Sequence, residues 1–494
     1  MSKQQSSDEN IDAPKITGFS DTDAIATMGT SSAAQEKTMK GRVRAWALWD
    51  WGSAAFNAVV TTFVFSRYLS SDYFIPQAII DGKGTPAGNT AYIAEQAANT
   101  SVISTSLAVA GFVIAVVAPV LGQRSDGSGK RKLWLAVNTG LVVLSMLAMY
   151  FVEPHAHFLL LGAILLAVGN VFFEFASVNY NAMLLQISTR ENMGRVSGFG
   201  WGMGYIGGIV LLLLLLVLFI EDLLGVEGHA GLLALASTQD GGALNIRVAI
   251  VVSAIWFAIF AIPVLLKVPE LPKTDQGKQP NYFQSYGILV RTIAKMAKKS
   301  PNVLLFLVSS AIFRDGLSAI FTFGAIIAAT VFGFSSSMVI YFAVAANLIA
   351  GIGTFVGGRL DDKIGPKNVI IISLIAMSLT GLGIFFLPRE DEGQGGPGFV
   401  GFWILGLILC TFVGPVQSAS RSFLARITPI GREGEIFGLY ATTGRAVGFI
   451  TSAIITVFIS TTGDNKWAII GIVIVLLAGL GTMIPVKAKQ TALD

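Results

Sequence analysis

The stretch that decides the fold occurs twice, once in each half of the chain. The first copy reads Gly122-Gln-Arg-Ser-Asp126-Gly-Ser-Gly129-Lys130-Arg131, and the second reads Gly358-Arg-Leu-Asp-Asp362-Lys-Ile-Gly365-Pro-Lys367. Both copies fit Gly-x-x-x-Asp-x-x-Gly followed by basic residues, and both lie between two long apolar runs. Because they are 236 residues apart in a chain of 494, the protein is predicted to contain two copies of one unit.

Each copy is expected to form a tight turn between two membrane-spanning helices. Glycine allows close approach and positive φ, and aspartate pairs with a helix N-terminus or with arginine. Basic residues hold such a loop on the cytoplasmic side of the membrane. We therefore predict two gating loops, made of Gly122, Asp126, Gly129, Lys130 and Arg131 in one half and Gly358, Asp362, Gly365 and Lys367 in the other.

The composition is that of an integral membrane protein. The chain is 53% hydrophobic and 13% charged, with a mean hydropathy of +0.67, whereas soluble domains carry roughly 25% charged residues. A net charge of +4 is too small to indicate nucleic-acid binding. With Cys410 as the only cysteine, three histidines and no nucleotide-binding or hydrolase motif, we predict no metal, no cofactor and no enzymatic activity.

A spanning helix needs about 20 apolar residues, and the chain offers twelve such runs. The predicted fold is therefore all-α, with two pseudo-symmetric bundles of six transmembrane helices. The first-half spans are predicted at 45–68, 100–122, 133–152, 157–184, 197–220 and 247–266. The second-half spans are predicted at 302–332, 336–357, 367–387, 399–420, 436–460 and 467–486.

The order of the remaining segments follows from charge and polarity. Residues 1–40 lack an apolar period and are predicted to be a disordered tail, followed by one bundle over 41–266 and another over 301–494. The charged, proline-containing stretch 267–300 is the predicted linker, and its part from Tyr282 to Lys299 is a candidate for a helix on the membrane face. Lysine and arginine concentrate in alternate loops, which predicts a cell-membrane protein with both termini in the cytoplasm.

The loop over 69–99 makes the two halves unequal. About 29 more residues separate the first span from the signature loop in the first half than in the second. The loop either gates the pore or is a tolerated surface insertion, and we favour the insertion.

Ionisable residues inside spans cost several kcal/mol, so each is a functional candidate. Asp50 lies early in the first span among three tryptophans, and Asn57 follows two turns later on the same face. Asp50 either belongs to a transport site or lies near the headgroups in an interfacial tryptophan belt. Glu174, with Asn181 below it, lies in the fourth span and is either a proton carrier or the partner of an arginine such as Arg445.

The second half supplies mostly cations. Arg314 and Asp315 are adjacent in the seventh span, before a glycine that permits a bend, and form either a binding site or a structural ion pair. Gln417 and Arg421 share one face of the tenth span, in a gate, a packing contact or a ligand site. Arg445 in the eleventh span needs an anionic partner, for which Glu174, Asp315 and a substrate carboxylate are all candidates.

The signature loops resemble those of the major facilitator superfamily, where they join the second and third and the eighth and ninth helices. Four segments resemble its autophagy-linked vacuole-effluxer family more specifically, including uncharacterised bacterial members. These segments are Trp46-Ala-Leu-Trp-Asp50-Trp-Gly-Ser53-Ala-Ala-Phe56, Arg195-Val-Ser-Gly198-Phe-Gly-Trp201-Gly-Met-Gly204-Tyr-Ile-Gly207-Gly, Arg314-Asp-Gly316, and Gln417-Ser-Ala-Ser-Arg421-Ser-Phe-Leu-Ala-Arg426 with Gly431-Arg-Glu433 and Phe437-Gly-Leu-Tyr440. The chain departs from that family's pattern at Arg314 and Ser53, where relatives commonly have asparagine.

The resemblance implies a secondary transporter, with amino-acid efflux as the best-described activity of the fungal members. We predict alternating access around a midplane site, with the two signature loops latching the cytoplasmic side and protons as a candidate coupling ion. The expected partners are a small-molecule substrate and the lipid bilayer, and the expected state is a monomer. The alternative is an exporter of drugs or other hydrophobic, anionic or lipid-like compounds.

Overall fold

A computed structural model describes residues 21–221, 225–270, 281–390, 395–429 and 431–487. Helices dominate these residues, and the one pair of strands among them is a short antiparallel hairpin, β1 (His229–Ala230) with β2 (Leu235–Ala236). Eleven of the described helical stretches are long and apolar enough to span a membrane. The predicted all-α membrane architecture is therefore confirmed, and of the twelve predicted spans only the first, 45–68, is not among these eleven stretches.

The elements of the first half follow one another as α1 (Asp21–Ala54), η1 (Ala55–Val64), α2 (Phe65–Leu69), η2 (Asp72–Phe74), α3 (Gln77–Asp81), α4 (Pro86–Ser128), α5 (Arg131–Ala148), η3 (Met149–Phe151), η4 (Ala156–Phe158), α6 (Leu159–Ala182), α7 (Leu184–Ile187), α8 (Met193–Leu215), η5 (Leu216–Ile220), β1, β2 and α9 (Leu244–Lys267). Those of the second half are α10 (Tyr282–Lys299), α11 (Pro301–Phe332), α12 (Ser336–Ile364), α13 (Pro366–Phe386), α14 (Pro397–Ile427), α15 (Glu433–Val447), α16 (Ile450–Thr462), η6 (Asn465–Trp467) and α17 (Ala468–Met483).

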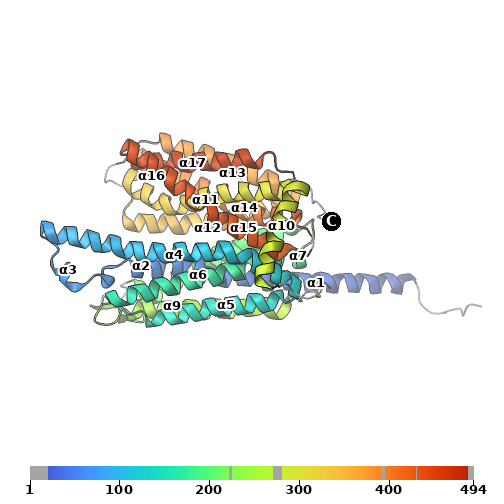
Figure 1. The fold of residues 1–494 in the computed structure, drawn as a ribbon, viewed down its shortest axis with the longest axis horizontal. Helices are drawn as coiled ribbons and strands as arrows, with labels where there is room; N and C mark the ends of the chain where they lie inside the picture. The colour runs from blue at the N-terminus through green and yellow to red at the C-terminus, as the bar shows by residue number, and fades with distance from the viewer. Residues whose placement is uncertain (1–20, 222–224, 271–280, 391–394, 430, 488–494) are drawn as a thin grey trace, which may run out of the picture.

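The two halves lie side by side, with the blue-to-green spans on one side of Figure 1 and the yellow-to-red spans on the other. The described ends of the chain both lie at the same end of the molecule, which we call the termini side. The predicted first span, 45–68, is built from the end of α1, the π-helix η1 and α2. π-Helical turns are uncommon and frequent at functional sites, and this one lies in the middle of a span.

Helix α1 is longer than predicted. It begins at Asp21, so residues 21–40, predicted to be disordered, are helical; residues 1–20 lie outside the described part of the chain. Residues 33–40 are rich in strong helix formers, and Glu36 pairs with Lys40 one turn later at 2.7 Å. Local helix propensity therefore continues α1 beyond its apolar part. The prediction of disorder rested on the absence of a hydrophobic period and did not take this propensity into account.

The signature stretches are also more helical than predicted. Helix α4 continues to Ser128 and α12 to Ile364, so the turns shrink to Gly129–Lys130 and to Gly365 alone. Each turn has a glycine with positive φ, Gly129 at 65° and Gly365 at 84°. Only glycine adopts this conformation at little cost, which explains why each motif needs its last glycine.

The predicted bend in the seventh span is wrong. Helix α11 continues without a break, and Gly316 instead allows the side chain of Leu476 in α17 to pack closely against it. The eleventh span is the interrupted one, because α15 ends at Val447 and α16 begins at Ile450. Its break faces Asp315, as described below.

The segment 69–99 packs on its own half of the protein. Phe74 is buried and its carbonyl accepts a hydrogen bond from Asn99, while the hydroxyl of Tyr73 donates to the carbonyl of Ser237 at 2.5 Å. A hydrogen bond from the Tyr92 hydroxyl holds the pKa of Asp72 below its usual range. These contacts agree with the favoured alternative of a surface insertion.

Candidate transport site

The first signature loop binds the start of α15 in the other half. Asp126 accepts hydrogen bonds from the backbone amides of Gly434 and Glu435, both at 3.0 Å. Arg131 pairs with Asp126 at 2.5 Å and with Glu433 at 3.2 Å. A carboxylate at a helix N-terminus satisfies free amides and the helix dipole together.

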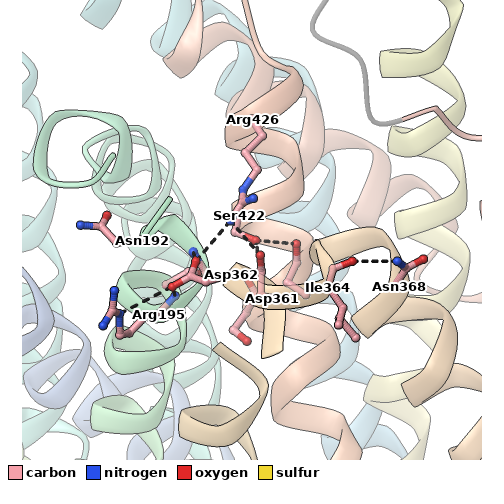
Figure 2. Close-up of polar contacts among 12 residues, drawn as sticks. Asn192, Arg195, Asp361, Asp362, Ile364, Asn368, Ser422 and Arg426 are labelled. Atoms are coloured by element: carbon pink, nitrogen blue, oxygen red, sulfur yellow. Dashed lines mark hydrogen bonds and ion pairs between the residues drawn. The ribbon is translucent and has the colours of Figure 1, made fainter. Parts of the chain in front are cut away.

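The second signature loop repeats this arrangement with the halves exchanged. Asp362 accepts hydrogen bonds from the amides of Gly194 and Arg195 at the start of α8, at 2.8 and 3.2 Å. Figure 2 shows Asp362 between Arg195 and Arg426, with Asp361 turned towards Ser422. Arg426 pairs with Asp361 at 2.9 Å. We call the two sets the Asp126 latch and the Asp362 latch.

Glycines bring the latched helices into backbone contact. A Cβ placed on Gly122 would lie 2.0 Å from the carbonyl oxygen of Gly434, and one on Gly358 would lie 2.7 Å from the carbonyl oxygen of Gly194. Glycine is therefore required at the first position of both motifs. Two of the three predicted basic residues next to the turns do not join the halves: Lys130 is exposed, and Lys367 donates to the carbonyl of Ile484 in its own half.

A third contact between the halves lies deeper, where Asp50 on α1 meets Arg421 on α14. Their side chains pair at 3.2 Å, and Tyr180 donates its hydroxyl hydrogen to the same Asp50 oxygen at 2.8 Å. Arg421 also donates to the side chain of Asn181 at 3.2 Å and to the carbonyl of Ser197 at 2.6 Å. Such a network restrains a buried pair in one geometry.

Two of the three tryptophans around Asp50 are buried inside the protein. Trp46 and Trp49 are buried and both stack on Tyr180, with ring centroids 4.5 and 4.3 Å apart. Trp46 also lies under the guanidinium of Arg421, 4.7 Å from it. These rings form part of the wall around the Asp50–Arg421 pair, which favours the transport-site alternative for Asp50 over the interfacial one.

The fourth span and the eleventh meet through Glu174 and Arg445. Arg445 pairs with Glu174 at 2.5 Å and donates to the side chain of Asn170 at 2.9 Å. Of the three partners considered for Arg445, the structure therefore selects Glu174. Both side chains remain partly exposed although they lie within spanning helices.

Arg314 and Asp315 do not pair with each other. Arg314 stacks on Tyr440, 3.9 Å from the ring centroid, and donates to the Tyr440 carbonyl at 3.2 Å. Asp315 is buried and accepts both the backbone amide and the hydroxyl of Thr451, at 2.7 and 2.6 Å. The two neighbours therefore hold the two parts of the broken eleventh span, α15 and α16.

Arg314 is a cation without a counter-ion in the described part of the chain. None of the salt bridges found there includes it. A guanidinium offers five N–H donors, and the contact to Tyr440 uses one of them.

Gln417 lies one turn before Arg421 and is half-buried.

A cavity of about 690 Å³ lies between the halves. It begins at Asp50 and reaches Arg67, Ile220 and Phe334, at the ends of α2, η5 and α11 away from the termini side. Asn57, which the π-helix places on this cavity, and Asn347 contribute amides from opposite halves. The halves are thus closed at the termini side, while the cavity extends to the other end.

Sequence reasoning missed several partners. Tyr180, Ser197 and Asn170 are neutral and lack any signal that would distinguish them from other polar residues in spans. Glu433 and Arg426 lie in segments that carry the family resemblance, so the resemblance could have identified them as candidate site residues. No cluster of three or more histidine, cysteine or acidic side chains is placed to hold a metal ion within the described ranges.

Solved structures with the same fold are major-facilitator transporters. The chain superimposes on the proton:xylose symporter XylE bound to 6-bromo-6-deoxy-D-glucose with a TM-score of 0.67, at 12% identity over 92% of this chain and 98% of that one. It also matches a bacterial homologue of the iron transporter ferroportin in the outward-facing state, with a TM-score of 0.58, at 14% identity over 92% of this chain and 100% of that one. The fold is that of the major facilitator superfamily.

The chain belongs to the family described as "Vacuole effluxer Atg22 like", whose model matches residues 38–494. A relative in Bacillus subtilis, the uncharacterized MFS-type transporter YxiO, is 24% identical over 91% of this chain and 95% of its own length. Autophagy-related protein 22-1 of Neosartorya fischeri is 24% identical over 63% of this chain, and the match spans 50% of that longer protein. The predicted resemblance is confirmed.

Proposed function

We propose that the protein is a secondary transporter that exports a small amino-acid-like solute by alternating access. The observation that carries this proposal is the cavity that ends at the Asp50–Arg421 pair, with the two latches closing the termini side beyond it. Alternating access needs one site that faces each side in turn and contacts that are made in only one state. The latches are such contacts, since they join the halves without a covalent link.

The charges between the two halves fit a zwitterion: Asp50 and Arg67 line the cavity itself, and Arg314 and Glu174 lie outside its lining. Arg314 has donors left for a carboxylate, and Glu174 and Asp50 offer carboxylates for an ammonium group. Arginine recognises carboxylates through two parallel hydrogen bonds, which makes Arg314 our proposed ligand for the substrate carboxylate. The direction of transport rests on the effluxer description of the family.

Proton coupling through Glu174 is part of the proposal. Glu174 is paired with Arg445 and still partly exposed, so a proton that neutralises it would release Arg445. A released Arg445 would then be available to the substrate carboxylate. Binding of substrate and proton would in this way be linked through one ion pair.

The proposed setting is the cell membrane, with a monomer whose termini lie in the cytoplasm. Both described ends lie on one side (Figure 1). Exposed Arg190, between α7 and α8, and exposed Lys363, in the last turn of α12, adjoin the Asp362 latch on that side. Positive charge favours the cytoplasmic face, so the cavity would open outward.

A second candidate is an exporter of hydrophobic compounds. Apart from Asp50, Arg67, Asn57, Asn347 and a few hydroxyls, the cavity is lined mainly by apolar and aromatic side chains, including Phe63, Trp201 and Leu212. Such a wall suits an apolar ligand as well as the side chain of a large amino acid.

The test is efflux from proteoliposomes loaded with a mixed amino-acid pool, with and without a pH gradient. Loss of particular amino acids is expected, and Arg314→Gln should slow it at least about tenfold because a charge-assisted contact is lost. Arg359→Gln is the matched control, since Arg359 is exposed and its one side-chain hydrogen bond among the described residues is to the carbonyl of Phe355 in its own helix α12.

The outcomes separate the two candidates. Retention of every amino acid by correctly folded protein would refute amino-acid export, and efflux of a hydrophobic dye from the same vesicles would then support the second candidate. Equal slowing by Arg314→Gln and Arg359→Gln would remove Arg314 from the site.

A further inference from the structure

Helix α10 connects the two halves across the termini side. It runs crosswise to the ends of the spans in Figure 1, and a capping box formed by Asn281 and Gln284 fixes its start. One face is packed on the protein through Ser285, Leu289, Thr292 and Met296. The spacing of these residues places them on one side of the helix.

The opposite face of α10 is apolar and uncovered. Phe283 is 91% exposed and Val290 is 65% exposed, and both lie on one stripe with the exposed residues Gly287, Ala294 and Ala297. These positions repeat every three or four residues, so they lie on one line along the helix. Isolated exposed apolar residues are ordinary, but a continuous stripe on an otherwise packed helix needs a partner.

A basic side adjoins this stripe. Arg291, Lys295 and Lys298 are exposed and lie next to it on the helical wheel, and α10 contains no acidic residue. None of the salt bridges found among the described residues includes these three cations. A helix with an apolar stripe beside a basic side is typical of one that lies in the interfacial layer of a membrane.

The position of α10 places it at the edge of the bilayer. Tyr286 donates its hydroxyl hydrogen to the carbonyl of Val116 in α4 at 3.2 Å. Val116 and the preceding Val109 and Phe112 are exposed on a spanning helix, on the side away from its contacts with α6 and α15, so they face acyl chains. On the helical wheel the apolar stripe lies between Tyr286, which points towards these residues, and the basic side.

We propose that α10 binds anionic phospholipids of the leaflet on the termini side, with Phe283 and Val290 inserted among the acyl chains and Arg291, Lys295 and Lys298 on the phosphates. The occupant is a lipid headgroup because the apolar stripe and the cations lie side by side, which a free anion would not require. This inference does not depend on the identity of the transported solute.

The bound leaflet also acts on the Asp126 latch. Arg432 precedes α15 and donates to the hydroxyl of Thr292 on the packed face of α10 at 3.0 Å. The next residues in the chain are Glu433 and Gly434, which contact Arg131 and Asp126. A lipid that holds α10 in place therefore supports the closed termini side.

The test uses the full chain with Cys410→Ser and Gly287→Cys, labelled with bimane and reconstituted in nanodiscs. An added Cβ at Gly287 meets no atom within 4 Å, so the label does not disturb packing. The nanodiscs contain phosphatidylcholine alone or mixed with phosphatidylglycerol, and either lipid carries bromine on its acyl chains. Brominated phosphatidylglycerol should quench the label more than brominated phosphatidylcholine at equal content, because it is enriched at α10.

The variants separate this site from general attraction of anionic lipid. In R291Q/K295Q/K298Q the enrichment should fall by roughly fivefold for each charge removed. The matched control R44Q/R190Q/K363Q removes three exposed cations from the same side and should keep it. Absence of quenching by either lipid, equal quenching by both lipids, or an equal loss in the two triple variants would overturn the proposal.

Discussion

Asp126 and Gly434 lie in different halves of the chain, and the side chain of one accepts the backbone amide hydrogen of the other at 3.0 Å. Asp362 and Gly194 repeat the same relationship at 2.8 Å with the halves exchanged. Each half therefore supplies one carboxylate and receives one at a helix N-terminus. The termini side is held closed by two equivalent sets of hydrogen bonds between the halves.

Asp126→Asn should loosen the termini side. The asparagine amide has one acceptor oxygen in place of two and loses the ion pair to Arg131. The closed form should therefore lose about 2 kcal/mol of stability, which raises the population of the open form roughly thirtyfold relative to the closed form. A cysteine in place of Ser125 in a Cys410→Ser background reports this, because Ser125 is fully buried and its hydroxyl has no partner among the described residues. Alkylation of this cysteine should accelerate by about the same factor. Asp81→Asn, at the other end of the molecule, is the control and should leave the alkylation rate unchanged. An unchanged alkylation rate in Asp126→Asn would show that Asp126 does not hold the termini side closed.

Gly122→Ala should separate the same helices by steric pressure. The added methyl group would lie 2.0 Å from the Gly434 carbonyl oxygen, a distance that forces α4 and α15 apart. Alkylation of the Ser125→Cys reporter should rise as it does for Asp126→Asn. Gly140→Ala introduces the same methyl group where nothing lies within 4 Å, and it should have no effect. If the Ser125→Cys reporter were alkylated equally slowly in Gly122→Ala and Gly140→Ala, the contact between Gly122 and Gly434 would not control opening of the termini side.

Asp50 and Arg421 should be strongly coupled in a double-mutant cycle. Asp50→Asn alone leaves a buried guanidinium without its counter-ion, which costs about 3 kcal/mol or more. Arg421→Gln alone leaves a buried carboxylate, while the double variant leaves neither. The free energy of unfolding in detergent, measured for all four proteins, should therefore fall less for the double variant than the sum of the single changes. Additive losses would show that the two residues act independently.

Glu174→Gln should abolish the effect of a pH gradient on transport if Glu174 carries the proton. The amide keeps a hydrogen-bond acceptor for Arg445 but does not titrate, so exchange of substrate across the membrane should continue. The comparison is gradient-driven efflux against exchange at equal pH, in the same vesicles. Gradient-driven efflux at the wild-type rate in this variant would assign coupling to another group.

The sequence by itself determined the helical spans, the duplication, and the aspartates and glycines of the latches, but not the residues of the other half that they bind. Long apolar runs leave few alternatives to helices because a bilayer offers backbone groups no water, and two signature motifs in register identify equivalent turns. Buried charges such as Asp50, Glu174 and Arg445 could be identified in advance because a charge in a span is costly unless it has a partner or a function.

Only the tertiary structure decided which charges are partners. Arg445 lies 271 residues from Glu174 and Arg421 lies 371 residues from Asp50, and spacing along one helix contains no information on such pairs. The break in the eleventh span is likewise a tertiary feature, since Asp315 on another helix accepts the Thr451 amide at that point. Helices form from local hydrogen bonds and hydrophobicity, whereas pairing between them depends on how two preformed bundles pack, which only the folded chain determines.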